Sequence, residues 1–307
     1  MSQIARYRLD EVHGFGAFAT VWRGWDPELE IAVAVKVLAE NWANHADVRE
    51  RFLAEARLLR RIVDPRVIRV HDVGTHDGRP YFVMDFVDGG TLADRVGTDL
   101  STTDALAFAV EAARAVQVLH DTGVLHRDVK PSNVLVRATD GSVLVSDLGS
   151  AKEIAGASGI TVTTGTPAYM SPEQARGRPL DPRTDVYSLG VLTYELLTGG
   201  APFATGDVGS LLTRTPADRA PSVARTADLR GTVDGAAVDR VLARALAFDP
   251  ADRPGSADEL ADALEHVAHG RRPRGFDRLG QGVPATVVAL ACLAAFVGAA
   301  GVIAFWP

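Results

Sequence analysis

Residues 126–133 place an acid, an amide and several basic side chains on eight consecutive positions. An apolar helical pattern precedes this stretch and an apolar strand pattern follows it, so its polar side chains belong to a loop rather than to a core. Asp128 can accept a proton from a hydroxyl, Lys130 can neutralise phosphate charge, and Asn133 can offer its carbonyl oxygen to a divalent metal. Phosphoryl transfer requires these components. The stretch therefore predicts a catalytic loop.

A second candidate cation lies in a β-strand pattern at 31–38. By the two-residue repeat of a strand, Lys36 shares one face with the small side chains of Ala32 and Ala34, while valines occupy the other face. A lysine is unusual on the packed face of a sheet. It is useful where a ligand lies beneath the sheet, so Lys36 is a candidate binding residue.

Glu55 is the candidate partner of Lys36. It falls in a helical pattern at 47–62, three and four residues from Phe52 and Leu59 on the apolar stripe. A carboxylate that faces inward needs a cation, which predicts an ion pair with Lys36. On spacing alone, a solvated Glu55 at the margin of the stripe is an equal alternative.

The elements that must position these residues form two groups along the chain. The first group has its strands and helix at 7–25, 31–38, 47–62, 67–73 and 80–86. The second group has helices and two short strands at 101–122, 134–137, 143–146, 186–198, 237–247 and 256–269. The stretch 205–235 is expected to form a helix and loops. A break at 87–90 separates a β-rich lobe at 7–87 from a helical lobe at 88–268, which predicts an α+β fold.

Composition sets further bounds. A length of 307 residues suits two lobes, or one domain with an appendage. The formal net charge of −7 argues against a nucleic-acid partner, because polyanions would be repelled. The single cysteine, Cys292, allows no internal disulfide and no thiolate-rich metal site. No apolar run follows a basic N-terminal start, so no cleaved signal peptide is expected.

The C-terminal region has a different composition. An uncharged apolar stretch at 283–305, about 23 residues long, would cross a bilayer core of roughly 30 Å as a helix. A buried helix of the soluble domain is the alternative, which the length and the sharp edges of the stretch disfavour. Four arginines in a linker at 269–282 precede the stretch and none follow it. This bias predicts a single-pass membrane protein with a cytoplasmic body, the C-terminus outside and no external domain.

The membrane stretch also carries a repeat of small residues. Ala291, Ala295 and Ala299 recur every four residues beside Gly298 and Gly301. Such a stripe allows a homodimer through the span, and ordinary small-residue filling is the alternative.

The loop at 126–133 resembles the catalytic loop of the protein kinase family, H-R-D-x-x-x-x-N, at every fixed position. The resemblance covers about residues 7–268, with the motifs of the family in order. It implies a two-lobed protein kinase fold with a small β-rich lobe and a larger helical lobe. It also implies ATP as phosphoryl donor, Mg²⁺ with Mn²⁺ as a possible substitute, and serine or threonine hydroxyls of proteins as acceptors.

Several motifs supply the nucleotide site that this resemblance implies. Gly14 and Gly16 resemble the first two glycines of the phosphate-binding loop, whose third glycine is replaced by Ala19. That alanine costs about 1 kcal/mol if the position needs a positive φ. Lys36 resembles the lysine that binds the α- and β-phosphates, and Glu55 resembles its helix partner. In the implied adenine pocket, Met84 occupies the gatekeeper position and residues 85–87 form the hinge. The residues assigned to this pocket are Val21, Ala34, Met84, Asp85, Val87 and Leu135.

Asp147, Leu148 and Gly149 resemble the Asp-Phe-Gly motif, with leucine in the place of phenylalanine. The resemblance implies that Asp147 and Asn133 bind the metal. It implies that Asp128 receives the hydroxyl proton and that Lys130 neutralises phosphate charge.

The segment between Asp147 and Glu173 resembles the activation segment of the family. The resemblance makes Thr161, Thr163 and Thr164 candidate autophosphorylation sites, with Arg127 as the cation that docks the phosphate. Thr166 then belongs to the substrate platform. A flexible threonine-rich loop is the alternative interpretation. Three further residues have architectural roles by the same resemblance: Glu173 paired with Arg253, and Asp185 as a cap that holds the catalytic loop.

Lys130 and Thr166 favour the serine/threonine branch, and residues 171–177 resemble bacterial membrane-associated kinases of that branch. The rival hypothesis is a membrane-anchored pseudokinase that binds a nucleotide or a partner, favoured only by Ala19 and Leu148. A P-loop NTPase is excluded because its G-x-x-x-x-G-K motif is absent. A phosphotransferase for small molecules would not need the segment 161–173.

Overall fold

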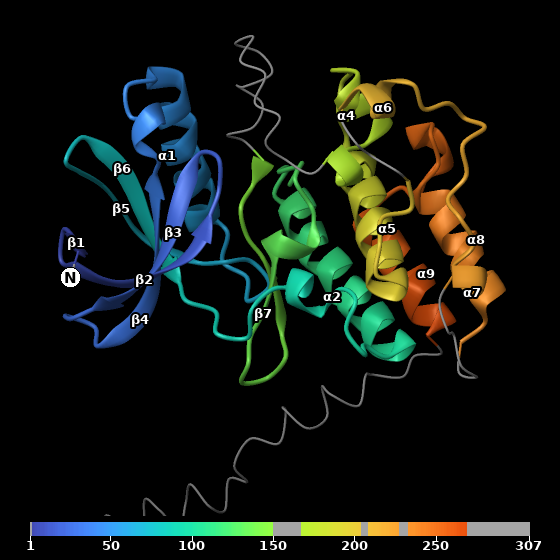
Figure 1. Ribbon diagram of the computed structural model, residues 1–307, viewed down its shortest axis with the longest axis horizontal. Helices are drawn as coiled ribbons and strands as arrows, with labels where there is room; N and C mark the ends of the chain where they lie inside the picture. Colours follow the sequence, from blue (N-terminus) through green and yellow to red (C-terminus); the bar gives the residue numbers. More distant parts are fainter. Residues whose placement is uncertain (1, 150–166, 204–207, 227–232, 269–307) are drawn as a thin grey trace, which may run out of the picture.

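The computed structural model describes residues 2–149, 167–203, 208–226 and 233–268. Figure 1 shows a β-rich lobe from the first third of the chain beside a helical lobe from the remainder. The predicted two-lobed α+β fold is therefore confirmed.

The smaller lobe is a six-stranded sheet with the strand order β1-β2-β3-β4-β6-β5 and antiparallel neighbours. Its strands are β1 (Ser2–Ile4), β2 (Tyr7–Phe15), β3 (Ala19–Asp26), β4 (Ile31–Leu38), β5 (Val70–His76) and β6 (Arg79–Asp85). The edge strand β1 was not predicted, because three residues are too few to show a period-two pattern.

The alternation along β4 sorts its side chains into two clusters as predicted. Val33, Val35 and Val37 are buried on one face of the sheet. Ala34 is buried on the other face, in a cluster that also contains Phe52 of α1 (Ala46–Arg61). This second cluster continues into the helical lobe, so one core supports both sides of the interlobe region.

The larger lobe is built around α2 (Thr102–Asp121), which packs against α5 (Pro182–Thr198) and α9 (Ala257–Val267). Its other helices, within the residues that the structure describes, are α4 (Pro172–Ala175), α6 (Val208–Leu212), α7 (Val223–Thr226) and α8 (Gly235–Ala245). A hairpin of β7 (Val134–Val136) and β8 (Val143–Val145) lies between the sheet and α2 in Figure 1. Short 3₁₀ turns occupy Glu40–Trp42, Leu92–Arg95, Pro131–Asn133, Pro167–Tyr169 and Pro250–Asp252.

Two predicted boundaries differ for identifiable reasons. Helix α5 begins at Pro182, four residues before the expected start, because the Asp181 side chain caps it by accepting the N–H of Arg183 at 2.8 Å. Strand β5 begins at Val70 rather than at residue 67. Val67 instead forms an isolated parallel bridge with Val145, which ties the β-rich lobe to the β7–β8 hairpin.

In the described part of the stretch 205–235 there are two short helices, α6 and α7, where one helix with loops was expected. The predicted linker at 269–282 and the predicted membrane span at 283–305 lie outside the described residues. Within the described ranges, no helix has both the length and the apolar character needed to cross a membrane.

Candidate active site

The catalytic loop is held in one conformation by its own side chains. Asn133 Nδ2 donates to the backbone oxygen of Asp128 at 2.8 Å and to its carboxylate Oδ2 at 2.9 Å. Lys130 Nζ lies 3.2 Å from the same Oδ2. These contacts fix the rotamer of the Asp128 carboxylate before any substrate binds. An acceptor held in this way is the arrangement that general base catalysis needs.

Asp185 anchors the start of this loop from helix α5. Its Oδ2 accepts the backbone N–H of His126 at 2.8 Å, and its Oδ1 accepts that of Arg127 at 2.7 Å. His120 Nε2 lies 2.9 Å from Oδ2, and the Asp185 side chain is fully buried. The predicted tie between Asp185 and the catalytic loop is therefore present. Arg127, at φ +63°, adopts a left-handed conformation that needs such support.

Two further contacts hold this strained turn. Gln174 Nε2 donates to the backbone oxygen of Arg127 at 2.8 Å, and Gly149 N–H donates to the oxygen of His126 at 2.8 Å. A Cβ atom at position 149 would lie 3.2 Å from backbone and side-chain atoms of Arg127. Any larger residue would force the neighbouring loop to shift by a few tenths of an ångström, so close approach of the two loops favours glycine. The role of Gln174 had no signal in the sequence.

Lys36 occupies the centre of a three-member charge cluster. Its Nζ lies 2.8 Å from Glu55 Oε1, as predicted, and 2.6 Å from Asp147 Oδ1, which was not predicted. The Glu55 side chain is 1% exposed, so the alternative of a solvated glutamate is wrong. Burial lowers the pKa of Lys36, but the charges of Asp147 and Glu55 outweigh it and raise that pKa above its usual value. The lysine is thus held in its cationic form.

The electrostatics of Asp147 follow from the same contact. Burial raises the pKa of its carboxyl, but the positive charge of Lys36 and its hydrogen bond outweigh burial and hold that pKa below its usual value. Asp147 has φ +56°, so its backbone is also in the left-handed region. The carboxylate remains ionised and accessible, with 35% of the side chain exposed.

Asn133 and Asp147 form a donor set that fits Mg²⁺. The β7–β8 hairpin brings them together, since the N–H of Ser146 donates to the oxygen of Asn133 at 2.9 Å. Asn133 Nδ2 is engaged by Asp128, which leaves its Oδ1 for a cation. One carboxylate and one amide oxygen, completed by phosphate oxygens, is a set that Mg²⁺ accepts. Among the described residues, no cluster of three or more His, Cys, Asp or Glu side chains is arranged to hold a metal ion.

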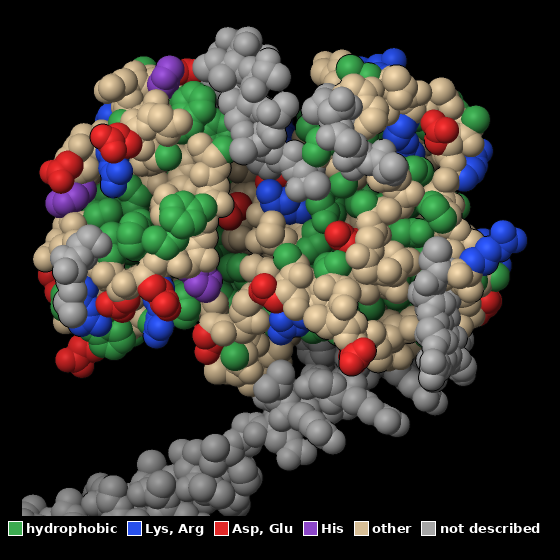
Figure 2. Space-filling view, viewed as in Figure 1, with side chains coloured by type: hydrophobic (Ala, Val, Ile, Leu, Met, Phe, Trp, Pro, Cys, Tyr) green, Lys and Arg blue, Asp and Glu red, His purple; other side chains and the backbone are tan. Residues whose placement is uncertain are grey.

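A cleft of about 900 Å³ gathers these groups between the lobes. Figure 2 shows it as a hollow that contains basic and acidic side chains. The predicted site residues that line it are Gly14, Gly16, Val21, Lys36, Glu55, Asp128, Lys130, Asn133 and Asp147. It brings together the predicted phosphate, metal and catalytic residues, although they come from both lobes.

The glycine-rich turn forms one wall of the cleft. Ala19 belongs to β3, where it pairs with Leu38, and it has no positive φ. The alanine in place of the third glycine therefore causes no backbone strain. The turn is closed by a hydrogen bond of 2.8 Å from the N–H of Gly16 to the oxygen of Ala19.

The predicted adenine residues form an apolar group next to this cleft. Ala34, Met84 and Val87 are buried in one cluster, and Val21 and Leu135 pack against it. Of the implied adenine pocket, only Val21 is among the described residues that line the cleft. Asp85, at the end of β6, has its carboxylate 2.6 Å from His71 Nε2. The adenine assignments therefore stay predictions.

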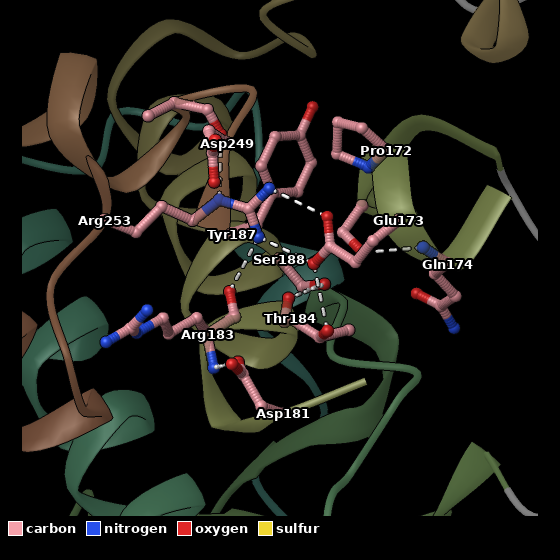
Figure 3. Close-up of polar contacts among 12 residues, drawn as sticks. Pro172, Glu173, Gln174, Asp181, Arg183, Thr184, Tyr187, Ser188, Asp249 and Arg253 are labelled. Carbon is pink, nitrogen blue, oxygen red and sulfur yellow. Dashed lines mark hydrogen bonds and ion pairs between the residues drawn. The ribbon is translucent and has the colours of Figure 1, made fainter. Parts of the chain in front are cut away.

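The predicted pair of Glu173 and Arg253 joins helix α4 to the segment before α9 (Figure 3). Arg253 Nη1 lies 2.7 Å from Glu173 Oε1, and its Nη2 lies 2.9 Å from Oε2. Burial raises the pKa of Glu173, but the hydrogen bonds and charge of Arg253 hold it below its usual value. Both side chains are buried, so the pair is a bidentate internal ion pair rather than a surface contact.

The predicted phosphorylation sites Thr161, Thr163 and Thr164, together with Thr166, lie outside the described residues. Leu148, which stands in the place of the phenylalanine of its motif, is buried in the core cluster that spans both lobes, so this position keeps an apolar packing role.

Known proteins resemble this chain in sequence over both lobes. Residues 7–267 match the protein kinase domain family. The chain is 40% identical over 281 residues to serine/threonine-protein kinase PknB of Mycobacterium tuberculosis, covering 87% of this chain and 44% of that protein. It is 37% identical over 285 residues to PknJ of the same species, covering 88% and 46%. The chain thus spans less than half the length of these relatives.

Solved structures agree on the fold. The kinase domain of Mycobacterium tuberculosis PknI superposes with a TM-score of 0.67 at 32% sequence identity. The match covers 87% of this chain and 98% of that domain. The similarity therefore extends over both lobes and over the cleft between them.

Proposed function

The chain belongs to the protein kinase family, and on that premise we propose that it is a serine/threonine protein kinase that transfers the γ-phosphoryl group of ATP to protein hydroxyls. One observation carries the proposal. Asp128, with its rotamer fixed by Asn133, opens onto the same cleft as the Lys36 charge cluster. An acceptor for the hydroxyl proton and a cationic site for phosphate thus line one cleft, which a nucleotide could occupy.

Each residue of this cleft has a separate role in the transfer reaction. Asp128 accepts a hydrogen bond from the substrate hydroxyl and orients it. It receives the hydroxyl proton as the new phosphate ester forms, while the bond from the γ-phosphorus to the bridging oxygen breaks and ADP leaves. Lys36 binds the α- and β-phosphates, while Lys130 faces the transferred group. Asn133 and Asp147 would hold Mg²⁺, or Mn²⁺ in its place. The cation would supply neutralisation of charge on the phosphate oxygens.

Support for the serine/threonine branch comes from Lys130 and from the printed names of the relatives. Nothing in the described residues favours the alternative of an inactive nucleotide- or partner-binding module, because Lys36, Glu55, Asp128, Asn133 and Asp147 are all present and mutually arranged. A catalytically active enzyme is therefore the proposal that accounts for more of the cleft.

A transfer assay tests this proposal. The full chain is incubated with γ-labelled ATP, Mg²⁺ and a mixture of peptides that contain serine, threonine or tyrosine. Label on serine and threonine is the expected result. Label confined to tyrosine would contradict the substrate class. Binding of ATP without any transfer would favour the inactive binding module.

We also infer that the activation segment is autophosphorylated at one or more of Thr161, Thr163 and Thr164. The support is the position of Arg127 beside Asp128, in a turn that Asp185 and Gln174 hold rigidly. A phosphate on the segment would add charge-assisted hydrogen bonds to this cation. Phosphopeptide mapping of active protein tests the inference, and an active protein without phosphate on this segment would contradict it.

For the C-terminal region we propose a single membrane anchor at 283–305, with the kinase lobes on the cytoplasmic side. The support is the apolar length of the stretch and the four arginines before it. Association of two copies through its small-residue stripe is compatible with this anchor. The test compares membranes containing the full chain with a chain ending at residue 282, by alkaline extraction and by protease access. Release of the full chain by alkali would contradict the anchor.

A further inference from the structure

The glycine-rich loop is fastened to the segment that follows β4 at two consecutive backbone positions. Trp42 Nε1 donates to the oxygen of Ala17 at 2.8 Å. The N–H of Ala39 donates to the oxygen of Phe18 at 2.8 Å. The second bond extends the pairing of β3 with β4, whereas the first depends on the side chain of one tryptophan.

The ring of Trp42 adds a packing contact to this hydrogen bond. It lies 5.1 Å from the ring of Phe18, centroid to centroid, at an interplanar angle of 33°. Trp42 is 8% exposed and Phe18 is 9% exposed. On its other side the indole meets the ring of His45 edge-on at 5.2 Å, at the N-cap position of α1. The indole is therefore enclosed between the loop and the start of α1.

Trp42 acts on the cleft only through the loop. Ala17 and Phe18 line the cleft, and Trp42 is not among the described residues that do so. At the tip, Phe15 is 83% exposed. The tip is closed by the bond from Gly16 to Ala19 and by the pairing of Phe15 with Thr20. Without the indole, the loop would lose one of its two hydrogen bonds to the segment that follows β4.

We propose that Trp42 is a positioning residue that holds the glycine-rich loop at the height where its backbone N–H groups meet the phosphates of the nucleotide. This inference rests on the proposed kinase function. A loop that is already ordered loses less conformational entropy when the nucleotide binds, so the indole strengthens ATP binding. It contributes little to the chemical step, because Asp128 and its partners are fixed by separate contacts in the other lobe.

Trp42→Phe tests the proposal in the full chain, because phenylalanine keeps a ring against Phe18 but removes the Nε1 donor. The KM for ATP is expected to rise about threefold to tenfold, the range of one net hydrogen bond, with kcat within about twofold of the original. Amide exchange of residues 14–19 without nucleotide is expected to accelerate by a similar factor. Trp25→Phe, a half-buried tryptophan farther along β3, is the matched control and should change neither quantity.

A second variant separates loss of the contact between Trp42 and Phe18 from a general loss of folding. Phe18→Leu keeps apolar volume but removes the aromatic contact, and it should also raise the KM for ATP. Because Phe18 and Trp42 are in contact, the free-energy effect of the double variant on ATP binding should be larger than either single effect but smaller than their sum. An unchanged KM and unchanged exchange in Trp42→Phe would overturn the proposal, as would a fall in kcat alone. If the original chain transfers no phosphate, the proposed function fails, while the exchange measurement still decides the role of Trp42.

Discussion

Lys36 on β4 and Asp147 after β8 form an ion pair of 2.6 Å, although 111 residues separate them in the chain. Because Lys36 also contacts Glu55 on α1, its ammonium is held by carboxylates from both lobes. This places the cation at the point where the two lobes meet the cleft. We therefore expect the lysine to matter both for catalysis and for holding the two lobes in their relative positions.

Lys36→Met is expected to lower phosphoryl transfer by at least about a hundredfold, since a positioned charge on the phosphates is lost. It should also destabilise the fold by roughly 3 kcal/mol, because Glu55 stays buried without this cation. Initial rates with labelled ATP and urea unfolding measure the two effects. Lys36→Arg is the charge-preserving control and should retain most of the stability. Transfer at an undiminished rate by Lys36→Met would contradict the role of this residue.

Removal of the Asp185 carboxylate should affect kcat more than the KM for ATP. Asp185→Ala leaves the N–H groups of His126 and Arg127 without acceptors in a buried region, at a cost of about 1–3 kcal/mol for each. The catalytic loop would lose its anchor, whereas Lys36 and Glu55 would be untouched. We expect kcat to fall at least about tenfold. Asp185→Asn keeps one acceptor oxygen and should be intermediate, so equal loss in both variants would argue against this hydrogen-bond role.

Glu173→Gln tests the buried ion pair between Glu173 and Arg253. The amide keeps the shape of the carboxylate but leaves Arg253 without a counter-charge, so we expect a loss of about 3–5 kcal/mol in the free energy of unfolding. Glu265→Gln is the control, because that glutamate is 55% exposed in its ion pair with Arg114 and should cost less than about 1 kcal/mol. Urea denaturation measures both. A similar loss in the free energy of unfolding for the two variants would show that burial of the Glu173–Arg253 ion pair has no special effect.

The same pair predicts a pH dependence of stability. The pKa of Glu173 is depressed in the folded chain, so the folded state binds fewer protons there than the unfolded state does. Its contribution is complete above the ordinary glutamate value of about 4.5 and is lost as the pH falls through the lower folded pKa. Unfolding curves of the original chain and Glu173→Gln should therefore converge toward acid pH. A gap between them that stays constant below pH 4 would contradict the depressed pKa.

The sequence predicted the parts of this site that repeat a short pattern. The alternation in β4 put Lys36 on the cleft face. The helical spacing of α1 left a buried and a solvated Glu55 equally open, and family resemblance favoured the pair with Lys36 that the structure contains. It also predicted the long-range pair of Glu173 and Arg253, but only through family resemblance. Local periodicity cannot report which distant carboxylate meets a given arginine.

Other contacts had no local signal. The approach of Asp147 to Lys36 depends on how the two lobes close, and the donation from Gln174 to Arg127 depends on where α4 packs. Trp42 lies in the short 3₁₀ turn after β4, where no repeating pattern singles it out, yet its indole reaches back to the glycine-rich loop. Each of these needs tertiary structure, because its partners are brought together by packing and not by spacing.

The most direct test of the central claim is incorporation of label from γ-labelled ATP by Asp128→Asn. The asparagine keeps the size of the side chain but cannot accept the hydroxyl proton, so incorporation should fall by about 10²- to 10⁴-fold while ATP still binds. Asp121→Asn, an exposed aspartate at the end of α2, is the matched control and should label normally. If Asp128→Asn labels itself as fast as the original chain, Asp128 is not the catalytic residue and the account is wrong.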